Sequence, residues 1–318
     1  MSRSARKIAL ALVCGLTLAG CAGQVDLSKK VTNRTTVKTA GSFTPEMLRT
    51  IDPCELLTDD LVASIGTKTS GSKDRSNYNE CQTRFKDKAN KADITLNVKL
   101  GNALLGVPKQ GGKQIGGLSV FESPTDTGCT ENAVTSRDPD RGVTALAFWE
   151  GGKPCDASGK LIESVIKRLA ENPPKYDVPA GSLVSRDPCA DLDDAAAQAA
   201  LGTTPKKSPY GIRVCTFEGK DNQVNVRYTG FTFDPFDTQS ASKPAKVDLT
   251  DKVKGAAQFR DNISPNRCQI EWVHRKLAGN RTENVNVSYE RTPAQAGEDP
   301  CAKLLPAAQA VATKVNSS

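Results

Sequence analysis

Asp52-Pro53-Cys54 and Asp187-Pro188-Cys189 are two copies of one tripeptide, and the segments that follow them decide the fold. A stretch of helical pattern follows each copy and ends at a glycine, Gly66 or Gly202. Aspartate is a favourable helix cap, and proline suits the first helical position because the N–H it lacks has no partner there. Glycine is the usual residue just beyond a helix. Both copies therefore predict a capped helix at the start of a structural unit.

The same order of landmarks continues beyond each helix, which indicates an internal repeat. Each copy has a second cysteine that opens a strand, a third in a later strand and a fourth that opens a final helix: Cys81, Cys129 and Cys155, and Cys215, Cys268 and Cys301. Apolar residues alternate in the strands between, as in Ile94, Leu96, Val98 and Leu100, and in Val224, Val226 and Tyr228. Alternation predicts antiparallel sheets with one wet face.

The final segment of each copy has apolar residues at helical spacing, which predicts a helix that covers the dry face of the sheet. These residues are Leu161, Ile162, Val165, Ile166 and Leu169, and Leu304, Leu305, Ala308, Val311 and Val315. The sequence therefore predicts an α+β fold of two tandem repeats. Each repeat is expected to be an antiparallel sheet of about five strands, flanked by N- and C-terminal helices and stapled by two disulfides.

The N-terminus has the pattern of an export signal. Arg3, Arg6 and Lys7 precede an apolar run over 8–18, which is shorter than the roughly 20 residues of a membrane span. The run ends in Leu18-Ala19-Gly20-Cys21, which resembles the lipobox of a bacterial lipoprotein. That resemblance implies cleavage before Cys21 and a diacylglycerol on its thiol. We expect a signal peptide over 1–20 and a lipidated flexible tether over 21–42.

The remaining boundaries follow from composition. Residues 173–182 contain Pro173-Pro174, which cannot continue a helix, and are expected to form a semi-rigid linker. The first repeat is then 43–172 and the second 183–318. The 318 residues carry a net charge of +7, but removal of 1–20 leaves 40 basic against 36 acidic residues. With mixed-sign clusters and few aromatic residues, this balance does not favour a nucleic-acid partner.

Eight cysteines remain beyond Cys21, and an even number in an exported protein implies disulfides. Four cysteines allow three connectivities within each repeat. We predict that neighbours in sequence pair, so that each bond fastens a terminal helix to the sheet. The expected bonds are Cys54–Cys81, Cys129–Cys155, Cys189–Cys215 and Cys268–Cys301. A metal site is not expected, because the chain has one histidine and no C-x-x-C pair.

These residues carry a family resemblance. The segment from Asp52 to Thr58, a glycine at the end of the helix and a lone cysteine opening a strand, all behind a lipobox, resemble the actinobacterial lipoproteins grouped as DUF3558. The match covers both repeats, although Ala190-Asp191-Leu192-Asp193 departs from the Leu-Leu-Thr pattern of the first. The family implies no activity. The layout also looks like the extracellular sensor domains of PknH-type kinases, without a specific motif.

Catalytic residues and cofactors are not expected. His274 is the sole imidazole, and its place at the end of an alternating strand indicates a structural role. The chain has no Gly-x-Ser-x-Gly motif, and its Gly-rich stretch around Lys113 lacks the Ser or Thr of a phosphate-binding loop.

An apolar loop follows the second predicted strand of each repeat. The residues are Leu104, Leu105 and Val107 in the first and Phe231, Phe233 and Phe236 in the second. Such loops either enter the core or line a ligand or partner surface. Our hypothesis is that they form the recognition edge of each repeat.

The predicted function is that of a non-enzymatic binding or scaffold lipoprotein, held by its lipid anchor on the outer face of the cell membrane. The expected partner is a cell-wall component, a protein or an apolar small molecule. The alternative is an extracytoplasmic carrier or sensor of a small apolar or lipid ligand, which requires a cavity of several hundred cubic ångströms between sheet and helices. A third and less favoured hypothesis is that the protein is a hydrolase of envelope material.

Overall fold

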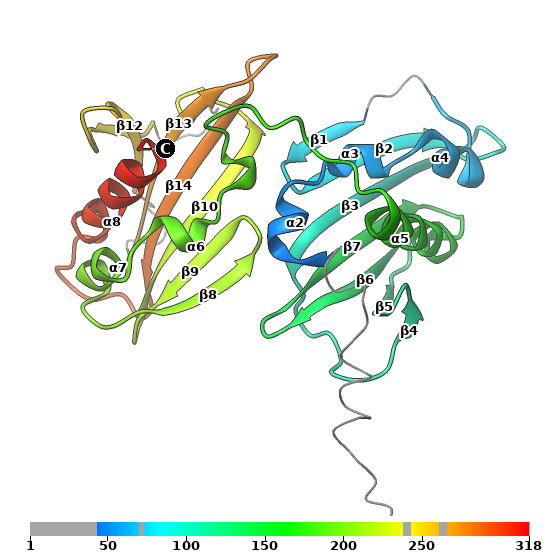
Figure 1. Cartoon of the computed structure of the whole chain (residues 1–318), viewed down its shortest axis with the longest axis horizontal. Coiled ribbons are helices and arrows are strands. Elements are labelled where there is room, and N and C mark those ends of the chain that lie inside the picture. The colour runs from blue at the N-terminus through cyan, green and yellow to red at the C-terminus, as the bar shows by residue number, and fades with distance from the viewer. Residues whose placement is uncertain (1–42, 70–72, 238–242, 261–265, 318) are drawn as a thin grey trace, which may run out of the picture. The chain divides into compact units, whose positions relative to one another are not determined.

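The computed structural model describes residues 43–69, 73–237, 243–260 and 266–317. Contacts divide the chain into units 1–38 and 39–318, so the described residues all belong to the second. The expected signal peptide over 1–20 and the whole expected tether over 21–42, Cys21 included, lie outside the described residues. The fold is α+β and mostly antiparallel (Figure 1). The described residues form seven α-helices and four disulfides.

The N-terminal half, residues 43–172, begins with three short helices and ends with a long one. The helices are α2 (Pro45–Arg49), α3 (Pro53–Leu56), α4 (Asp59–Ile65) and α5 (Pro154–Glu171). The strands are β1 (Asp74–Asn77), β2 (Glu80–Lys86), β3 (Asp93–Ala103), β4 (Lys113–Ile115), β5 (Leu118–Pro124), β6 (Gly128–Arg137) and β7 (Asp140–Trp149). Their order is β2-β3-β7-β6-β5-β4, with β1 beside β2.

The C-terminal half, residues 183–317, has the helices η2 (Leu183–Ser185, 3-10), α6 (Pro188–Asp191), α7 (Asp194–Leu201) and α8 (Pro300–Val315). Its strands are β8 (Lys206–Gly211), β9 (Val214–Glu218), β10 (Asn222–Thr232), β11 (Ala245–Val247), β12 (Ala256–Arg260), β13 (Arg267–Lys276) and β14 (Thr282–Arg291). Their order is β11-β12-β13-β14-β10-β9-β8. Each half thus has seven described strands rather than about five, because short edge strands without alternating apolar residues were not predicted.

The predicted first helix of each half is in fact two helices. Thr58 caps α4, accepting a hydrogen bond from Leu61 N at 3.2 Å, and Asp193 caps α7 in the same way. The second cap competes with continuation of the first helix, so the chain turns there. Gly202 ends α7 in the left-handed conformation, at φ 73°, as predicted. Gly66 instead ends α4 in extended backbone, and a Cβ there would lie 2.2 Å from the Lys86 carbonyl oxygen.

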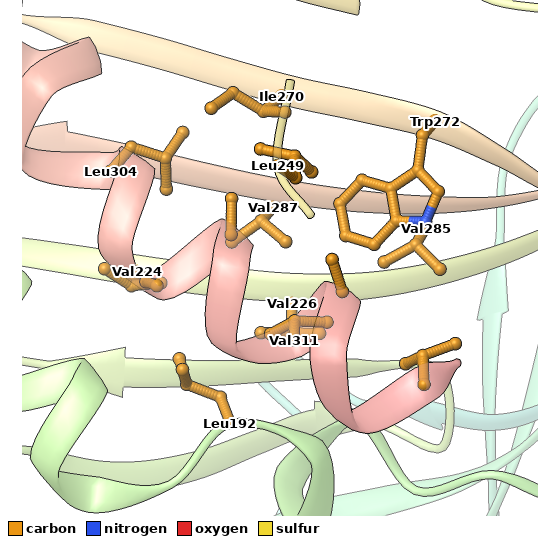
Figure 2. Packing of buried hydrophobic residues seen from close by; sticks show 14 of the residues in the cluster. Leu192, Val224, Val226, Leu249, Ile270, Trp272, Val285, Val287, Leu304 and Val311 are labelled. Carbon is orange, nitrogen blue, oxygen red and sulfur yellow. The ribbon is translucent and has the colours of Figure 1, made fainter. Parts of the chain in front are cut away.

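Alternation produces two hydrophobic clusters. In the C-terminal half, Leu304 and Val311 of α8 lie over Val226 and Val287 of the sheet, with Trp272 beside them (Figure 2). In the N-terminal half, α5 buries its apolar stripe against β6 and β7. Four disulfides fasten helices to strands: Cys54–Cys81, Cys129–Cys155, Cys189–Cys215 and Cys268–Cys301. These are the four predicted pairs.

Each half places one side chain in the hydrophobic cluster of the other half. Tyr78 belongs to the cluster of the C-terminal half, and Ile212 belongs to that of the N-terminal half. Gly230 has to be small here, because a Cβ would lie 2.4 Å from the Tyr78 ring. Asn102 of β3 also pairs with Gly211 of β8, which makes the two sheets continuous. The two halves are therefore joined both by buried side chains and by a strand pair.

The predicted linker forms hydrogen bonds with residues of both halves. Tyr176 N donates to the Thr50 carbonyl at 2.8 Å, and the Tyr176 hydroxyl donates to the Tyr78 carbonyl at 2.8 Å. Ser182 donates to buried Glu283 of β14 at 2.8 Å. Residues 173–182 thus contact both halves.

Candidate functional site

The sheet of the C-terminal half has one covered face and one open face. Along β10, Val224, Val226 and Tyr228 are buried toward α8, whereas Gln223 and Arg227 point to the opposite face because strand side chains alternate. The open face is hollowed into a groove of about 510 Å³. This volume lies within the range of small-molecule sites.

Strand register arranges the groove in rows across β10, β14 and β13. The rows are Gln223, Glu290 and Arg267; Asn225, Ser288 and Gln269; and Arg227, Asn286 and Glu271. Strand β9 extends two rows with Thr216 and Val214. Tyr210 of β8, Thr229 and Thr232 complete the lining. The wall is therefore a grid of amides, hydroxyls and charged groups on paired strands, which fixes their spacing.

Glu271 is the centre of a hydrogen-bond network at one side of the groove. Its carboxylate accepts from Asn284 Nδ2 at 2.7 Å, from Asn286 Nδ2 at 3.0 Å and from Gln269 Nε2 at 3.1 Å. Asn284 also donates to the Phe233 carbonyl at 2.9 Å. Three amide donors thus satisfy much of the acceptor capacity of Glu271 without an ion pair.

The two guanidinium groups of the groove are exposed and unpaired. Arg227 and Arg267 lie on β10 and β13, and neither forms an ion pair with any residue that the structure describes. Each guanidinium retains five N–H donors in a planar fork, which matches the two oxygens of a carboxylate. The groove thus has donor capacity that none of the described residues uses.

Tyr210 stands at the β8 end of the groove with 52% of its surface exposed. Exposed rings of this kind offer an apolar face together with a polar hydroxyl. Together with Val214, the ring supplies apolar surface in a lining of mostly polar residues.

The predicted recognition loops have different positions. The second one adjoins the groove, because Thr232 lines it and Phe231 and Phe233 flank Thr232. Phe233 is half exposed beneath Arg281, whose guanidinium carbon is 4.2 Å from the ring centroid, and Phe236 is also exposed. Phe231 is partly buried and packs edge-on against Tyr78, with ring centroids 5.4 Å apart.

In the first loop, Leu104 is buried, Val107 is partly buried and Leu105 is 76% exposed. None of the three lines the groove of the C-terminal half. The two loops therefore do not come together in one site.

His274 lies at the end of β13, as predicted, with Nε2 at 2.7 Å from the Gly181 carbonyl oxygen. This bond attaches the linker to the sheet. Among the described residues, one group of three possible metal ligands occurs, Glu122, Cys129 and Cys155, but the two sulfurs are joined in a disulfide and are not thiolates.

Sequence reasoning identified the wet face of the strands but not the groove. The signal was present in the polar positions between the buried ones: Gln223, Asn225 and Arg227, then Arg267, Gln269 and Glu271. Three neighbouring strands with amides and arginines at alternate positions indicate a polar array. The register that aligns them is a property of the folded sheet.

Comparison with protein-family models, with curated proteins and with solved structures found no match. Within the described ranges, no helix has both the length and the apolar character needed to cross a membrane.

Proposed function

We propose that the chain is a non-enzymatic binding protein of the cell envelope and that the groove of its C-terminal half holds the ligand. The observation that carries this proposal is the pair of exposed, unpaired guanidiniums, Arg227 and Arg267, in a concave array of amides and hydroxyls. Such groups are positioned on a rigid sheet rather than on loops, which favours specific binding.

The carrier or sensor alternative is less well supported. It places an apolar ligand between sheet and helices, where the structure has buried aliphatic side chains such as Val226, Val287 and Val311 in contact (Figure 2). The polar groove on the opposite face favours a polar ligand.

We further propose attachment to the outer face of the cell membrane through a lipid on Cys21. The support is the Leu18-Ala19-Gly20-Cys21 sequence together with the four disulfides, which persist in oxidising compartments. Two acyl chains provide stable anchoring where one is marginal.

A tandem-repeat origin and membership of the DUF3558 group belong to the same proposal. In each half, a short helix that begins with a Pro-Cys pair precedes the strands, and a long helix that begins with another Pro-Cys pair follows them. The disulfides join equivalent elements, α3 to β2 and α6 to β9, then β6 to α5 and β13 to α8. The Asp52 to Thr58 segment supports the family assignment.

The binding role is tested in intact cells with a photo-reactive amino acid at one position of the full chain. Gln223 in the groove is the test site, and exposed Lys303 on α8 is the control. We expect a crosslink to an envelope component from Gln223 and none from Lys303. Equal crosslinking from both positions, or none from Gln223, would contradict a binding function of the groove.

The anchor is tested separately by metabolic labelling with a palmitate analogue. We expect Cys21→Ala to lose the label and to be released into the medium. Cys14→Ala changes a thiol inside the expected signal peptide and should leave labelling intact. Labelling that persists in Cys21→Ala would overturn the anchor.

A further inference from the structure

The charge pattern of the groove identifies the class of ligand. Glu271 is already bound by Asn284, Asn286 and Gln269, whereas Arg227 and Arg267 have no anionic partner among the residues described. Glu290, the second carboxylate of the lining, lies across the ladder from Arg267 and accepts from Gln223 Nε2 at 3.5 Å. Two guanidiniums without ion pairs to described residues thus face one weakly bonded carboxylate in this groove. A planar guanidinium takes a carboxylate with two parallel hydrogen bonds, which fixes orientation as well as energy.

The groups between the two arginines suit hydroxyls. Asn225, Ser288 and Gln269 form the row that separates the row of Arg267 from the row of Arg227. Amides and hydroxyls both donate and accept, as the hydroxyl groups of a sugar do. The row thus matches a hydroxyl-rich segment that lies between two carboxylates.

Tyr210 adds a face for the apolar side of a sugar ring. It is 52% exposed at the β8 end of the groove, and its ring is an amphipathic surface next to the polar rows. The groove lies on the open face of a sheet, so a ligand is free to extend beyond it.

We infer that the groove binds a segment of an acidic polysaccharide, with uronate-type carboxylates on Arg227 and Arg267, sugar hydroxyls on the intervening amide row and a ring against Tyr210. The inference rests on the proposed binding function and names the ligand class of that same site. Two arginines against one weakly bonded carboxylate, Glu290, favour this occupant over a neutral glycan or an apolar peptide.

The test is calorimetric titration of the full chain, in mild detergent, with hexagalacturonate and with its methyl ester. The ester keeps the hydroxyls and removes the negative charge. We expect binding of the acid, and affinity for the ester lower by about tenfold or more, because charge-assisted hydrogen bonds are lost.

Variants assign the binding to the groove. Arg227→Gln and Arg267→Gln are each expected to weaken hexagalacturonate binding by about 10- to 100-fold. Arg84→Gln is the matched control, since Arg84 is an exposed arginine on β2 outside the groove, and it should bind like the wild type. Equal affinities for acid and ester, no binding of either, or equal loss in Arg84→Gln would overturn the inference.

The two proposals fail in different ways. If Gln223 crosslinks an envelope component in cells while hexagalacturonate does not bind, the binding function stands and the acidic polysaccharide is wrong. A crosslink from Gln223 to a protein would likewise support the binding function and rule out the acidic polysaccharide. If neither experiment detects a ligand, the binding function itself is wrong.

Discussion

Arg227 of β10 lies directly across the ladder from Asn286 of β14, and Asn286 donates a hydrogen bond to Glu271 of β13 at 3.0 Å. One amide therefore stands between a cation and an anion that are two strands, or about 10 Å, apart. Because amides hold Glu271, the guanidinium of Arg227 stays available. This relationship gives the groove its capacity for an external carboxylate.

The contact between the halves depends on Arg213, which is 3% exposed. Its guanidinium donates to the carbonyls of Val184 at 2.5 Å and of Arg49 at 2.6 Å, and its carbon is 5.2 Å from the centroid of the Tyr78 ring. Arg213→Met leaves these buried carbonyls without donors. We expect it to lower the free energy of unfolding by about 3 kcal/mol or more in urea denaturation.

Arg227→Met is the control for that measurement. It also replaces an arginine by methionine, but at an exposed position without an ion pair. Its effect should stay within about 0.5 kcal/mol. Similar losses in the two variants would show that Arg213 does not hold the halves together.

Helix α5 lacks the cap that its three counterparts have. Asp52, Asp187 and Asp299 each precede a Pro-Cys pair and accept a hydrogen bond from the cysteine N–H, at 2.9–3.0 Å. Lys153 occupies this position before Pro154-Cys155 and makes no side-chain cap. Lys153→Asp should therefore raise the free energy of unfolding by about 1 kcal/mol.

Lys153→Ala is the control that distinguishes the effect of a new cap on stability from the effect of losing the lysine. It removes the positive charge of the lysine but adds neither an acceptor nor a negative charge, so its stability should remain near that of the wild type. If the alanine and aspartate variants unfold at the same urea concentration, the aspartate is not capping α5.

Glu131 makes stability depend on pH. It is buried on β6, 1% exposed, with Lys113 Nζ at 3.8 Å from Oε1, and burial raises the pKa of its carboxyl above the ordinary 4.5. The folded state then binds the proton more tightly than the unfolded state. The favourable contribution is complete below pH 4.5 and is lost as pH rises through the raised pKa.

Glu131→Gln removes this titration with little change of shape. Urea denaturation between pH 4 and 8 should show the variant close to the wild type at the acidic end and more stable at neutral pH. A variant that is less stable than the wild type at neutral pH would mean that the ion pair with Lys113 outweighs the cost of burying the charge.

The disulfides are expected to contribute similarly. Cys129 and Cys155 are separated by 26 residues, and Cys189 and Cys215 also by 26. Closing loops of this length restricts the unfolded chain by about 3.5 kcal/mol in the chain-entropy model. Replacing both cysteines of either pair by alanine should cost about that amount, as measured by urea denaturation. A much smaller loss for one pair would show that its helix is held mainly by packing.

Local signals predicted the elements that depend on local physics. The caps at Asp52 and Asp187, the left-handed Gly202 and the alternation along β3 and β10 are all recorded in neighbouring residues. The cysteine pairs were predictable because bonds between cysteines that are adjacent in the sequence fasten each terminal helix to the sheet of its own half. The sequence also holds a third copy of the tripeptide, Asp299-Pro300-Cys301, which marks the capped start of α8.

Long-range relationships were beyond a single sequence. Nothing near Tyr78 or Ile212 shows that each enters the hydrophobic cluster of the other half. Likewise, the alignment of Arg227, Asn286 and Glu271 depends on register across three strands. The wet face was predictable, but its conversion into a groove required the folded sheet.

The most direct measurement is an NMR titration of the full chain with hexagalacturonate that follows the arginine Nε–Hε signals. We predict that the signals of Arg227 and Arg267 shift together and saturate at one ligand concentration, while that of Arg84 stays in place. Unchanged Arg227 and Arg267 signals, or equal shifts of all exposed arginines, would contradict the account of the groove as the binding site.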